Sequence, residues 1–350
     1  MENRISKRIE WIDIAKAIGI YLMIFNHNND MPCKHIQFVI ASFHMPLFFL
    51  LSGFTLKKQE RTFNDIMIFI KRRVIMLGVP YIIWAFVFSS GVNLKNILEI
   101  LYGSNQSIGG AQSNSVLWFL PCIMISSCIT FILITFVYNK VGLLIISVVA
   151  VSIGGFLPVH DFFSRYGYLF SFNIAFVGIG FMIIGYLLKC FLQSYNGSLI
   201  LEKTMKSTYK LYLLSACCLG LVSIIAYCNT QTQRTYLHRA VMALGQWGNI
   251  YIFFITGVIG SMAIIFISMI INRNKLLSKV MCCIGKNTIV ILSIHLTILN
   301  FLECILNSMN LSGHILLEFV STIITLLISF VISYIIGRYA PCLERGKSEQ

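Results

Sequence analysis

Residues 13–27 read Asp13-Ile-Ala-Lys16-Ala-Ile-Gly-Ile-Tyr-Leu-Met-Ile-Phe-Asn-His27, a largely apolar stretch that carries three ionisable side chains. In an α-helix, which turns about 100° per residue, Lys16 and His27 point within about 20° of each other and Asp13 within about 40° of His27. Lys16 and His27 would then lie roughly 16 Å apart along the helix axis. Ionisable groups are costly in hydrocarbon, so such a stripe is a functional-site hypothesis. The alternative is an ion pair of Asp13 and Lys16 at the cytoplasmic end, with His27 in interfacial water.

The composition is that of a membrane protein. Hydrophobic residues make up 57% of the 350 residues, charged residues only 11%, and the mean hydropathy is +0.81. Apolar runs long enough to cross about 30 Å of hydrocarbon recur along the whole chain. We therefore predict an all-α integral membrane protein, a single bundle of about ten transmembrane helices. The predicted spans are 9–27, 38–56, 74–91, 115–138, 141–158, 168–191, 211–228, 247–271, 284–303 and 314–337.

The net charge of +14 follows the predicted topology. If the N-terminus is cytoplasmic, nearly all Lys and Arg residues fall in inner segments. The exceptions are Lys16, which lies within the first span, and a small outer set. The outer segments hold only Lys34, Lys95, Arg165, Arg234 and Arg239. The positive-inside rule then predicts that both termini are cytoplasmic. The excess of positive charge is explained in this way without nucleic acid as a partner.

Residues 1–350 are interpreted as one transmembrane domain, since no internal repeat or soluble appendage is visible. The first span is not expected to be a cleaved signal peptide, because Glu10, Asp13 and Lys16 lie within or beside it. The 11 cysteines show no CxxC pair and no zinc-like spacing with histidine, so neither a disulfide framework nor a metal site is predicted. Two outer connections, 92–114 and 229–246, are long enough to carry function.

A second informative stretch, 42–54, reads SFHMPLFFLLSGF. Pro46 is expected near a helix start, where its missing N–H does least harm. His44 would then lie close to the outer surface of the membrane. Ser52 and Gly53 are small enough to let another helix or a ligand come close. The alternative is purely structural, because single features of this kind are common in helices without function.

A third stretch places Lys71, Arg72 and Arg73 side by side at the predicted cytoplasmic start of the span 74–91. Such cations ordinarily reflect topology and contacts with lipid headgroups. The N-terminus of a helix is itself slightly positive, so an anionic ligand would relieve the charge there. Arginine side chains also suit phosphate oxygens. An anion site and a topology signal both remain open for this segment.

Several short segments occur in order over most of the chain. They are 8–16 (RIEWIDIAK), Lys16 with His27 eleven residues later, 43–49 (FHMPLFF), 52–54 (SGF), Arg73 with 80–81 (PY), 117–120 (LWFL), and 285–288 (GKNT) followed by His295. This ordered set resembles the membrane-bound acyltransferase-3 family, which includes fucose 4-O-acetylase-like and O-antigen-acetylating enzymes. Many members carry a second arginine three residues after the first in the inner basic loop, where this chain has Met76.

The resemblance implies that an acyl group, most often acetyl, passes from cytoplasmic acetyl-CoA or another acyl-CoA to a hydroxyl of an extracytoplasmic glycan or lipid-linked sugar. A hydroxyl has a pKa far above 7, so its attack on a thioester needs a base within hydrogen-bond reach. His27 is the candidate general base, because a neutral imidazole accepts and returns a proton near pH 7. No metal is expected to take part.

The resemblance assigns roles to further residues. Asp13 and Lys16 would pair lower on the first helix, either to orient it or to lie along the path of the CoA arm, and His44 would orient His27 or the acceptor. The remaining candidates are Lys71, Arg72 and Arg73 for the CoA phosphates, Ser52 and Trp118 for the donor, and Asn287 and His295 for the acceptor. His295 is also typical of a satisfied core histidine.

A transporter or flippase of a lipid-linked sugar or polysaccharide is the competing class, because ten helices and an intramembrane charge stripe suit it too. Against it, the two halves of the sequence show no matched pair of Gly/Pro-broken helices. A sensor of polar ligands would need a signalling domain, and none is recognised. The expected location is the cell membrane, where membrane lipids surround a multi-pass chain.

Overall fold

The structure is a computed structural model and describes residues 8–28, 34–57, 62–89, 91, 93–105, 116–157, 166–231, 240–311 and 313–339. These residues form helices and contain no β-strand, only an isolated bridge between Val241 and Gln246. The helices are α1 Glu10–His27, α2 Lys34–Ala41, α3 His44–Thr55, α4 Phe63–Arg73, α5 Val79–Val87, α6 Leu94–Tyr102, α8 Phe119–Phe136, α9 Lys140–Phe156, α11 Phe172–Leu192, α12 Tyr195–Lys206, α13 Thr208–Gln231, α14 Ile250–Ile271, α15 Lys275–Lys286, α16 Thr288–Ser308 and α17 Ile315–Tyr339. Short helical turns are η1 Val74–Gly78, η3 Leu169–Ser171 and η4 Met242–Leu244.

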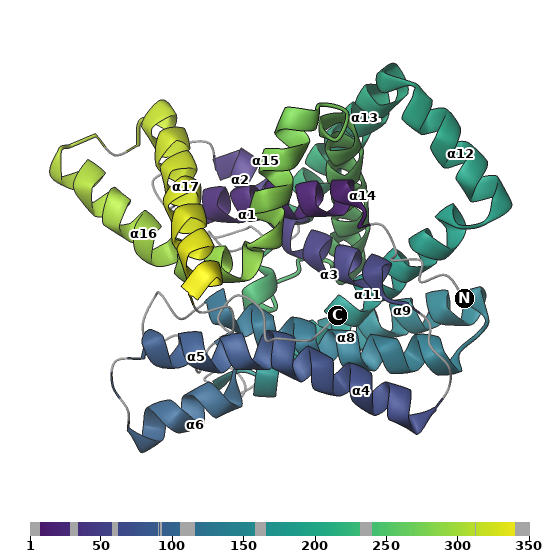
Figure 1. Ribbon diagram of the computed structural model, residues 1–350, viewed down its shortest axis with the longest axis horizontal. Coiled ribbons are helices and arrows are strands. Elements are labelled where there is room, and N and C mark those ends of the chain that lie inside the picture. The colour runs from purple at the N-terminus through teal and green to yellow at the C-terminus, as the bar shows by residue number, and fades with distance from the viewer. Residues whose placement is uncertain are drawn as a thin grey trace.

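Helix α1 lies in the middle of the bundle (Figure 1) and packs against α3, α14, α15, α16 and α17. Its apolar side chains are almost completely buried, with Ile14, Ile20 and Ile24 at 0% exposure. Gly19 allows α3 to come close, because a Cβ there would lie 3.0 Å from side-chain atoms of Leu47 and Phe48. The stripe of ionisable residues in α1 therefore lies inside the protein.

Every predicted span overlaps a helix, so the all-helical fold class is confirmed. Within the described part of the chain, 7 helices are long and apolar enough to cross a membrane. They correspond to the predicted spans 38–56, 115–138, 168–191, 211–228, 247–271, 284–303 and 314–337. The chain is thus a multi-pass membrane protein, while the total of ten spans, the single domain and the cytoplasmic termini stay predictions.

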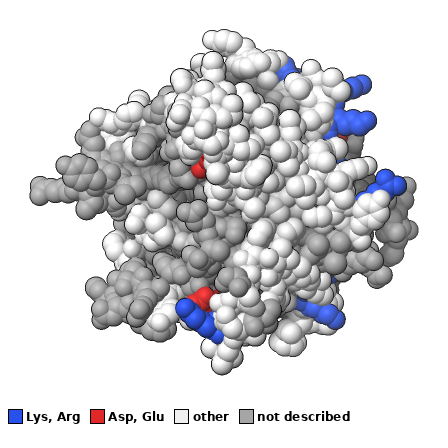
Figure 2. All heavy atoms as spheres, turned by 90° about the vertical axis from the view of Figure 1, so that its left-hand side faces the viewer, with Lys and Arg blue, Asp and Glu red and all other residues white. Residues whose placement is uncertain are grey.

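Helix α17 has the polarity expected of a helix that faces lipid. Apart from Arg338 near its end, its exposed residues are apolar or tyrosine and include Leu316, Val320, Leu327, Val331 and Ile335. Its buried residues are polar, namely Glu318, Ser321, Thr322, Thr325, Ser329 and Ser333. Figure 2 shows that the surface on this side is largely uncharged, with Lys and Arg towards its edges. Apolar side chains outside and polar groups inside suit a hydrocarbon solvent.

The predicted span 38–56 is interrupted by a turn at residues 42–43, so that α3 begins at His44. Pro46 lies in the first turn of α3, as predicted, where no helical carbonyl is left without its donor. The interruption directs His44 back towards the end of α2, and its Nδ1 is 2.9 Å from the carbonyl oxygen of Ile40. The turn therefore positions His44.

The prediction that Lys71, Arg72 and Arg73 stand at a helix N-terminus is wrong. The helix begins at Phe63, where the Thr62 hydroxyl accepts a hydrogen bond from the backbone N–H of Asp65. It continues through α4, η1 and α5 (Figure 1), so the three cations occupy the last turn of α4, between two helical segments. An N-cap hydroxyl with a carboxylate in the first turn is a strong start signal, and it lies well upstream of the apolar run.

Helices α3 and α11 pack backbone against backbone through two glycines. A Cβ on Gly53 would lie 1.9 Å from the carbonyl oxygen of Met182, and a Cβ on Gly185 would lie 2.0 Å from that of Leu50. Small residues permit such close approach between membrane helices. The small Ser52–Gly53 pair was expected to let either another helix or a ligand come close. At Gly53 it is another helix, α11, that does so.

We expect Gly53→Ala to lower the free energy of unfolding by about 1–3 kcal/mol or more, because a methyl group has no space beside Met182. Gly220→Ala in α13 is the matched control, since a Cβ there meets nothing within 4 Å. Alanine favours a helix by about 1 kcal/mol over glycine. Thermal unfolding of the detergent-solubilised protein measures both variants. Equal Tm values would contradict the close packing of α3 and α11.

Candidate active site

His27 is the last residue of α1, and the helix end that carries it is held by two neighbouring elements. Gln37 of α2 donates from Nε2 to the carbonyl oxygens of Asn28 at 2.6 Å and Phe25 at 3.3 Å. These bonds satisfy carbonyls that a helix C-terminus leaves open. The Asn28 side chain in turn donates to the carbonyl oxygen of Glu318 in α17 at 3.2 Å. The backbone at His27 is therefore fixed relative to α2 and α17.

A pocket of about 300 Å³, called the histidine pocket below, opens beside His27. It is lined by Met23, Asn26, His27, Ala41, His44, Met45, Asn105, Val116, Trp118, Phe119, Ala240, Val241, Met242, Ala243, Leu244 and Leu292. Three candidates from widely separated segments, His27, His44 and Trp118, thus meet around one space. Their meeting supports the grouping made from the sequence, although it tests no chemical role.

The two connections that were predicted to be outer, 92–114 and 229–246, both contribute residues at or beside the histidine pocket. Asn105 lies within the first connection, Val116 follows it, and residues 240–244 lie near the end of the second. Loops that meet at a pocket are common carriers of binding function. Arg234, His238 and Arg239, which made the second connection of interest, lie outside the described residues.

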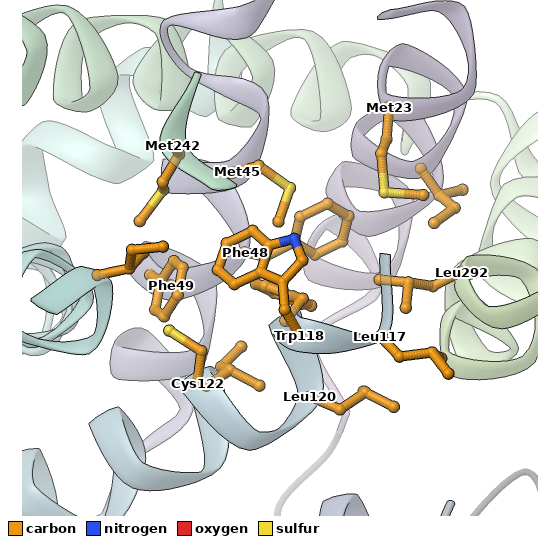
Figure 3. Packing of buried hydrophobic residues seen from close by; sticks show 14 of the residues in the cluster. Met23, Met45, Phe48, Phe49, Leu117, Trp118, Leu120, Cys122, Met242 and Leu292 are labelled. Carbon is orange, nitrogen blue, oxygen red and sulfur yellow. The ribbon is translucent and has the colours of Figure 1, made fainter. Parts of the chain in front are cut away.

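The inner wall of the histidine pocket is apolar and rich in methionine. Met23, Met45 and Met242 lie around the indole ring of Trp118 (Figure 3), and all four side chains are at least 93% buried. Thioether side chains are flexible and fill irregular space. The polar groups of the pocket are therefore concentrated at its two histidines and two asparagines.

His295 of α16 lies directly behind His27. The centroids of the two imidazole rings are 5.4 Å apart, with an angle of 48° between the ring planes. His295 is fully buried and its Nδ1 is 2.8 Å from the carbonyl oxygen of Leu292, whereas His27 is only partly buried. Of these two histidines, only His27 lines the pocket.

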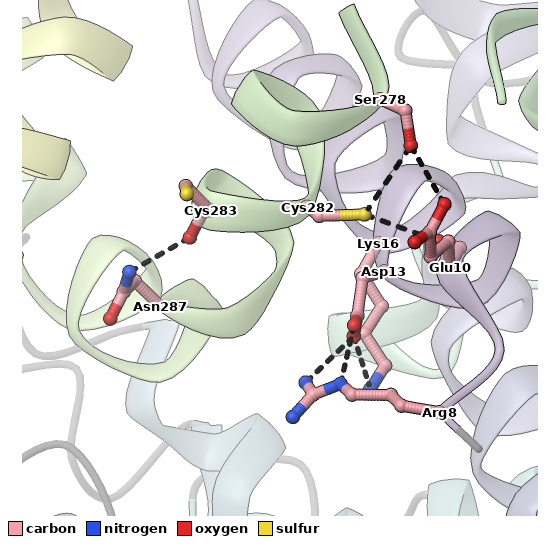
Figure 4. A network of polar contacts seen from close by, with 8 residues as sticks. All are labelled: Arg8, Glu10, Asp13, Lys16, Ser278, Cys282, Cys283 and Asn287. Atoms are coloured by element: carbon pink, nitrogen blue, oxygen red, sulfur yellow. Dashed lines mark hydrogen bonds and ion pairs between the residues drawn. The ribbon is translucent and has the colours of Figure 1, made fainter. Parts of the chain in front are cut away.

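The opposite end of α1 holds a carboxylate clamped by two cations (Figure 4). Asp13 accepts hydrogen bonds from Arg8 Nε at 2.5 Å and from Arg8 Nη2 at 2.9 Å, and Lys16 Nζ is 3.9 Å from its Oδ1. The Asp13 side chain is 3% exposed and that of Arg8 is 51% exposed. The hydrogen bond to Asp13 raises the pKa of Arg8 above its usual range. The predicted pair of Asp13 and Lys16 is confirmed, and Arg8 is the closer partner.

A second pocket, of about 760 Å³ and called the cation pocket below, opens at this end of the molecule. It is lined by Arg8, Ile9, Trp11, Ile12, Asp13, Lys16, Phe54, Thr55, Lys57, Lys189, Leu192, Gln193 and Leu201. Four cations therefore surround one carboxylate that is already paired, which leaves the pocket positively charged. Such a charge attracts anions and most favours those with several phosphate oxygens.

Helix α15 locks onto the start of α1 beside the clamp (Figure 4). The Ser278 hydroxyl donates to Glu10 at 3.2 Å, and a Cβ on Gly285 would lie 1.9 Å from the carbonyl oxygen of Asp13. Asn287 ends this helix and donates to the carbonyl oxygen of Cys283 at 2.8 Å. Asn287 lines neither pocket. It lies instead at the junction between α15 and α16.

The other donor candidates also lie away from the two pockets. Lys71 and Arg72 are exposed on α4, and the Arg73 guanidinium stacks over the ring of Phe69, 5.1 Å from its centroid. Ser52 is partly buried, and its carbonyl oxygen accepts a hydrogen bond from the Thr55 hydroxyl at 2.8 Å. None of these candidates is among the residues that line the histidine pocket or the cation pocket.

Sequence reasoning missed Arg8, Lys57 and Lys189 as members of one pocket. A signal was present, because all three lie in or beside inner segments of the predicted topology, next to the ends of apolar runs. Helical spacing did not reveal Arg8, which precedes α1 and folds back onto Asp13. Which inner cations converge is decided by how α1, α3 and α11 pack, which no local pattern shows.

The fold and the two pockets together define a multi-pass helical membrane protein with a polar site at each end of one buried helix. The sequence profile of the acyltransferase domain matches residues 9–338, so the chain belongs to the acyltransferase-3 family and is an acyltransferase. A search of curated proteins finds no match. Within the described residues, no group of three or more His, Cys, Asp or Glu side chains is arranged to hold a metal ion.

We expect Arg8→Gln to destabilise the protein by about 1–2 kcal/mol, because Asp13 keeps only the more distant Lys16. The cost stays below the roughly 3–5 kcal/mol of a fully buried pair, since Arg8 is half exposed to solvent screening. Adding Asp13→Asn to Arg8→Gln should recover part of the loss by removing the uncompensated charge. Thermal unfolding of the unaltered protein, the two single variants and the double variant forms a double-mutant cycle that isolates the interaction between Arg8 and Asp13. Additive losses would show that the clamp contributes nothing.

Proposed function

We propose that the protein is an O-acyltransferase of the cell membrane that moves an acetyl group from cytoplasmic acetyl-CoA to a hydroxyl of an extracytoplasmic carbohydrate. The observation that carries this proposal is the pair of pockets at opposite ends of α1 and α3. One pocket gathers cations and the other gathers imidazoles. Cations suit the phosphates of the donor, and an imidazole suits the deprotonation of a hydroxyl.

The donor phosphates bind, in this proposal, in the cation pocket rather than at Lys71, Arg72 and Arg73. Lys57 follows the end of α3, and Lys189 lies in the last turn of α11, where its Nζ donates to the carbonyl oxygen of Leu56 at 2.5 Å. Several cations that converge on one space can neutralise a multiply charged ligand, whereas exposed side chains on α4 are screened by water.

The chemical step takes place at the histidine pocket. His27 accepts the proton of the acceptor hydroxyl while its oxygen attacks the carbonyl carbon of the thioester, and a C–O bond forms. The tetrahedral intermediate collapses with cleavage of the C–S bond. The electron pair of that bond leaves with sulfur, and the proton held by His27 passes to the thiolate. The products are an O-acyl ester and free CoA, and His27 is neutral again.

The acyl group has to travel from one pocket to the other inside the protein. Lys16 and His27 are roughly 16 Å apart along α1, and the pantetheine arm of CoA separates its acyl end from its phosphates. Met23 and Met45 line the histidine pocket, and Phe48 is buried in the same apolar cluster (Figure 3). The proposal requires these flexible side chains to make way for the arm.

The acceptor enters from the outer side, where the two long connections meet the histidine pocket. Trp118 offers an aromatic face, which suits the apolar face of a sugar ring. His44 is held by the carbonyl oxygen of Ile40 and is placed to orient the acceptor or His27. A glycan or a lipid-linked sugar is therefore the proposed partner, with membrane lipids around the helices.

We expect His27→Ala to reduce acyl transfer by about 10²–10⁴-fold, because a positioned general base contributes that much. The measurement is mass analysis of acetyl groups on the cell-surface glycans of expressing cells. His35→Ala is the control, since His35 is exposed on α2 and lies outside the histidine pocket. The His27→Ala variant should accumulate in the membrane like the unaltered protein. Full acetylation with His27→Ala would refute the assignment.

We expect the double variant Lys57→Gln, Lys189→Gln to weaken CoA binding by about tenfold or more, because hydrogen bonds to charged groups contribute about 1.5–3 kcal/mol each. The double variant Lys71→Gln, Arg72→Gln removes the same charge from α4 and should leave the Kd for CoA nearly unchanged. Isothermal titration of the detergent-solubilised protein with CoA compares them without an acceptor. A larger effect in the second variant would place the donor phosphates at α4 instead.

A further inference from the structure

His295 is held in one tautomer by its own helix. The carbonyl oxygen of Leu292, 2.8 Å from Nδ1, can only accept a hydrogen bond, so Nδ1 carries the hydrogen. Nε2 then carries a lone pair. It is completely buried and has no hydrogen-bond partner within the described part of the chain. The ring is thus a buried acceptor with a defined orientation.

A buried acceptor without a donor costs about 1–3 kcal/mol, so its presence calls for an explanation. A histidine that served only to fill the core would gain by satisfying both of its nitrogens. The neighbour that the structure provides is His27, with ring centroids 5.4 Å apart. At this separation the two rings are neighbours, and a hydrogen bond between them requires His27 to turn one of its nitrogens towards Nε2 of His295.

We propose that His295 is a positioning residue that accepts a hydrogen bond from His27 and thereby directs the other nitrogen of His27 into the histidine pocket. This inference rests on the proposed role of His27 as the general base. His295 itself is fully buried and does not line the pocket, so it acts through His27 and not on the acceptor. It is therefore distinct from the acceptor-binding role predicted from the sequence.

In this proposal each nitrogen of His27 has one role in the transfer of the proton. Neutral His27 has one N–H and one lone pair, and the bond to His295 uses the N–H. The lone pair then faces the acceptor hydroxyl and receives its proton, which gives an imidazolium. That imidazolium keeps donating to Nε2 of His295, which stabilises it while the proton waits for the CoA thiolate. His295 neither gains nor loses a proton.

The test uses two amides of different length. In His295→Gln the amide reaches the position of Nε2 and keeps an acceptor near His27, whereas in His295→Asn it reaches only the position of Nδ1. We expect His295→Asn to lower the maximal rate of transfer at least 10²-fold and His295→Gln less than tenfold, with the KM for acetyl-CoA unchanged in both. The rate is that of radiolabel transfer from acetyl-CoA to the glycan fraction of inside-out membrane vesicles. Equal maximal rates in the two variants would overturn the proposal.

A second readout does not depend on turnover or on the role of His27 as base. Carbethoxylation of His27 by diethyl pyrocarbonate, followed by mass spectrometry, reports how available its lone pair is. We expect the reaction to slow at least fivefold in His295→Asn and not in His295→Gln, whereas equal rates would overturn the proposal. Transfer that survives His27→Ala would instead refute the general base, and the carbethoxylation result would still decide whether the two rings are coupled.

If His295→Asn does not fold, the unaltered protein still decides the question. In protein labelled with ¹⁵N-histidine, the signal lost on His295→Gln identifies His295. Its nitrogens should appear as an Nδ1–H donor and an Nε2 that accepts a hydrogen bond. A free Nε2 lone pair, or a hydrogen on Nε2, would overturn the proposal.

Discussion

The structure depends on burying a helix that carries a carboxylate. Asp13 is buried in the first turn of α1, where an uncompensated charge would be very costly. Arg8 and Lys16 compensate it, and α15 then packs directly onto the backbone of Asp13 because residue 285 is glycine. Helix α1 is therefore fixed against α15 at the depth of Asp13. Since a helix is a rigid rod, the depth of His27 is set with it.

Much of this architecture could be predicted from the sequence. Apolar runs of sufficient length are strong signals, and each of them overlaps at least one helix. The face shared by Asp13, Lys16 and His27 needed only the helical period, and the ion pair of Asp13 and Lys16 followed from their spacing. His27, His44 and Trp118 were grouped through the family resemblance, and one pocket now contains them. In these cases the deciding information is local or belongs to an ordered set of motifs.

The rest depends on contacts between segments that are distant in sequence. Arg8 precedes its helix, so no helical spacing links it to Asp13, and Lys189 reaches the cation pocket only because Gly53 and Gly185 bring α3 and α11 together. His295 looks like an ordinary core histidine until α16 is packed behind α1. The basic residues of α4 show the opposite case, in which a real local pattern was placed at the wrong end of a helix because its N-cap lies upstream of the apolar run.

The two pockets share α1 and α3 but no lining residue, and the proposed function requires that they stay separate. A continuous polar passage between them would let ions and water cross the membrane. Met23, Met45 and Phe48, all at most 8% exposed, belong to the apolar cluster beside the histidine pocket. Methionine can change its rotamer at little cost, so a thin flexible arm can pass where a hydrated ion cannot. In the proposed function, apolar and flexible side chains of this kind reconcile a donor on one side of the membrane with an acceptor on the other.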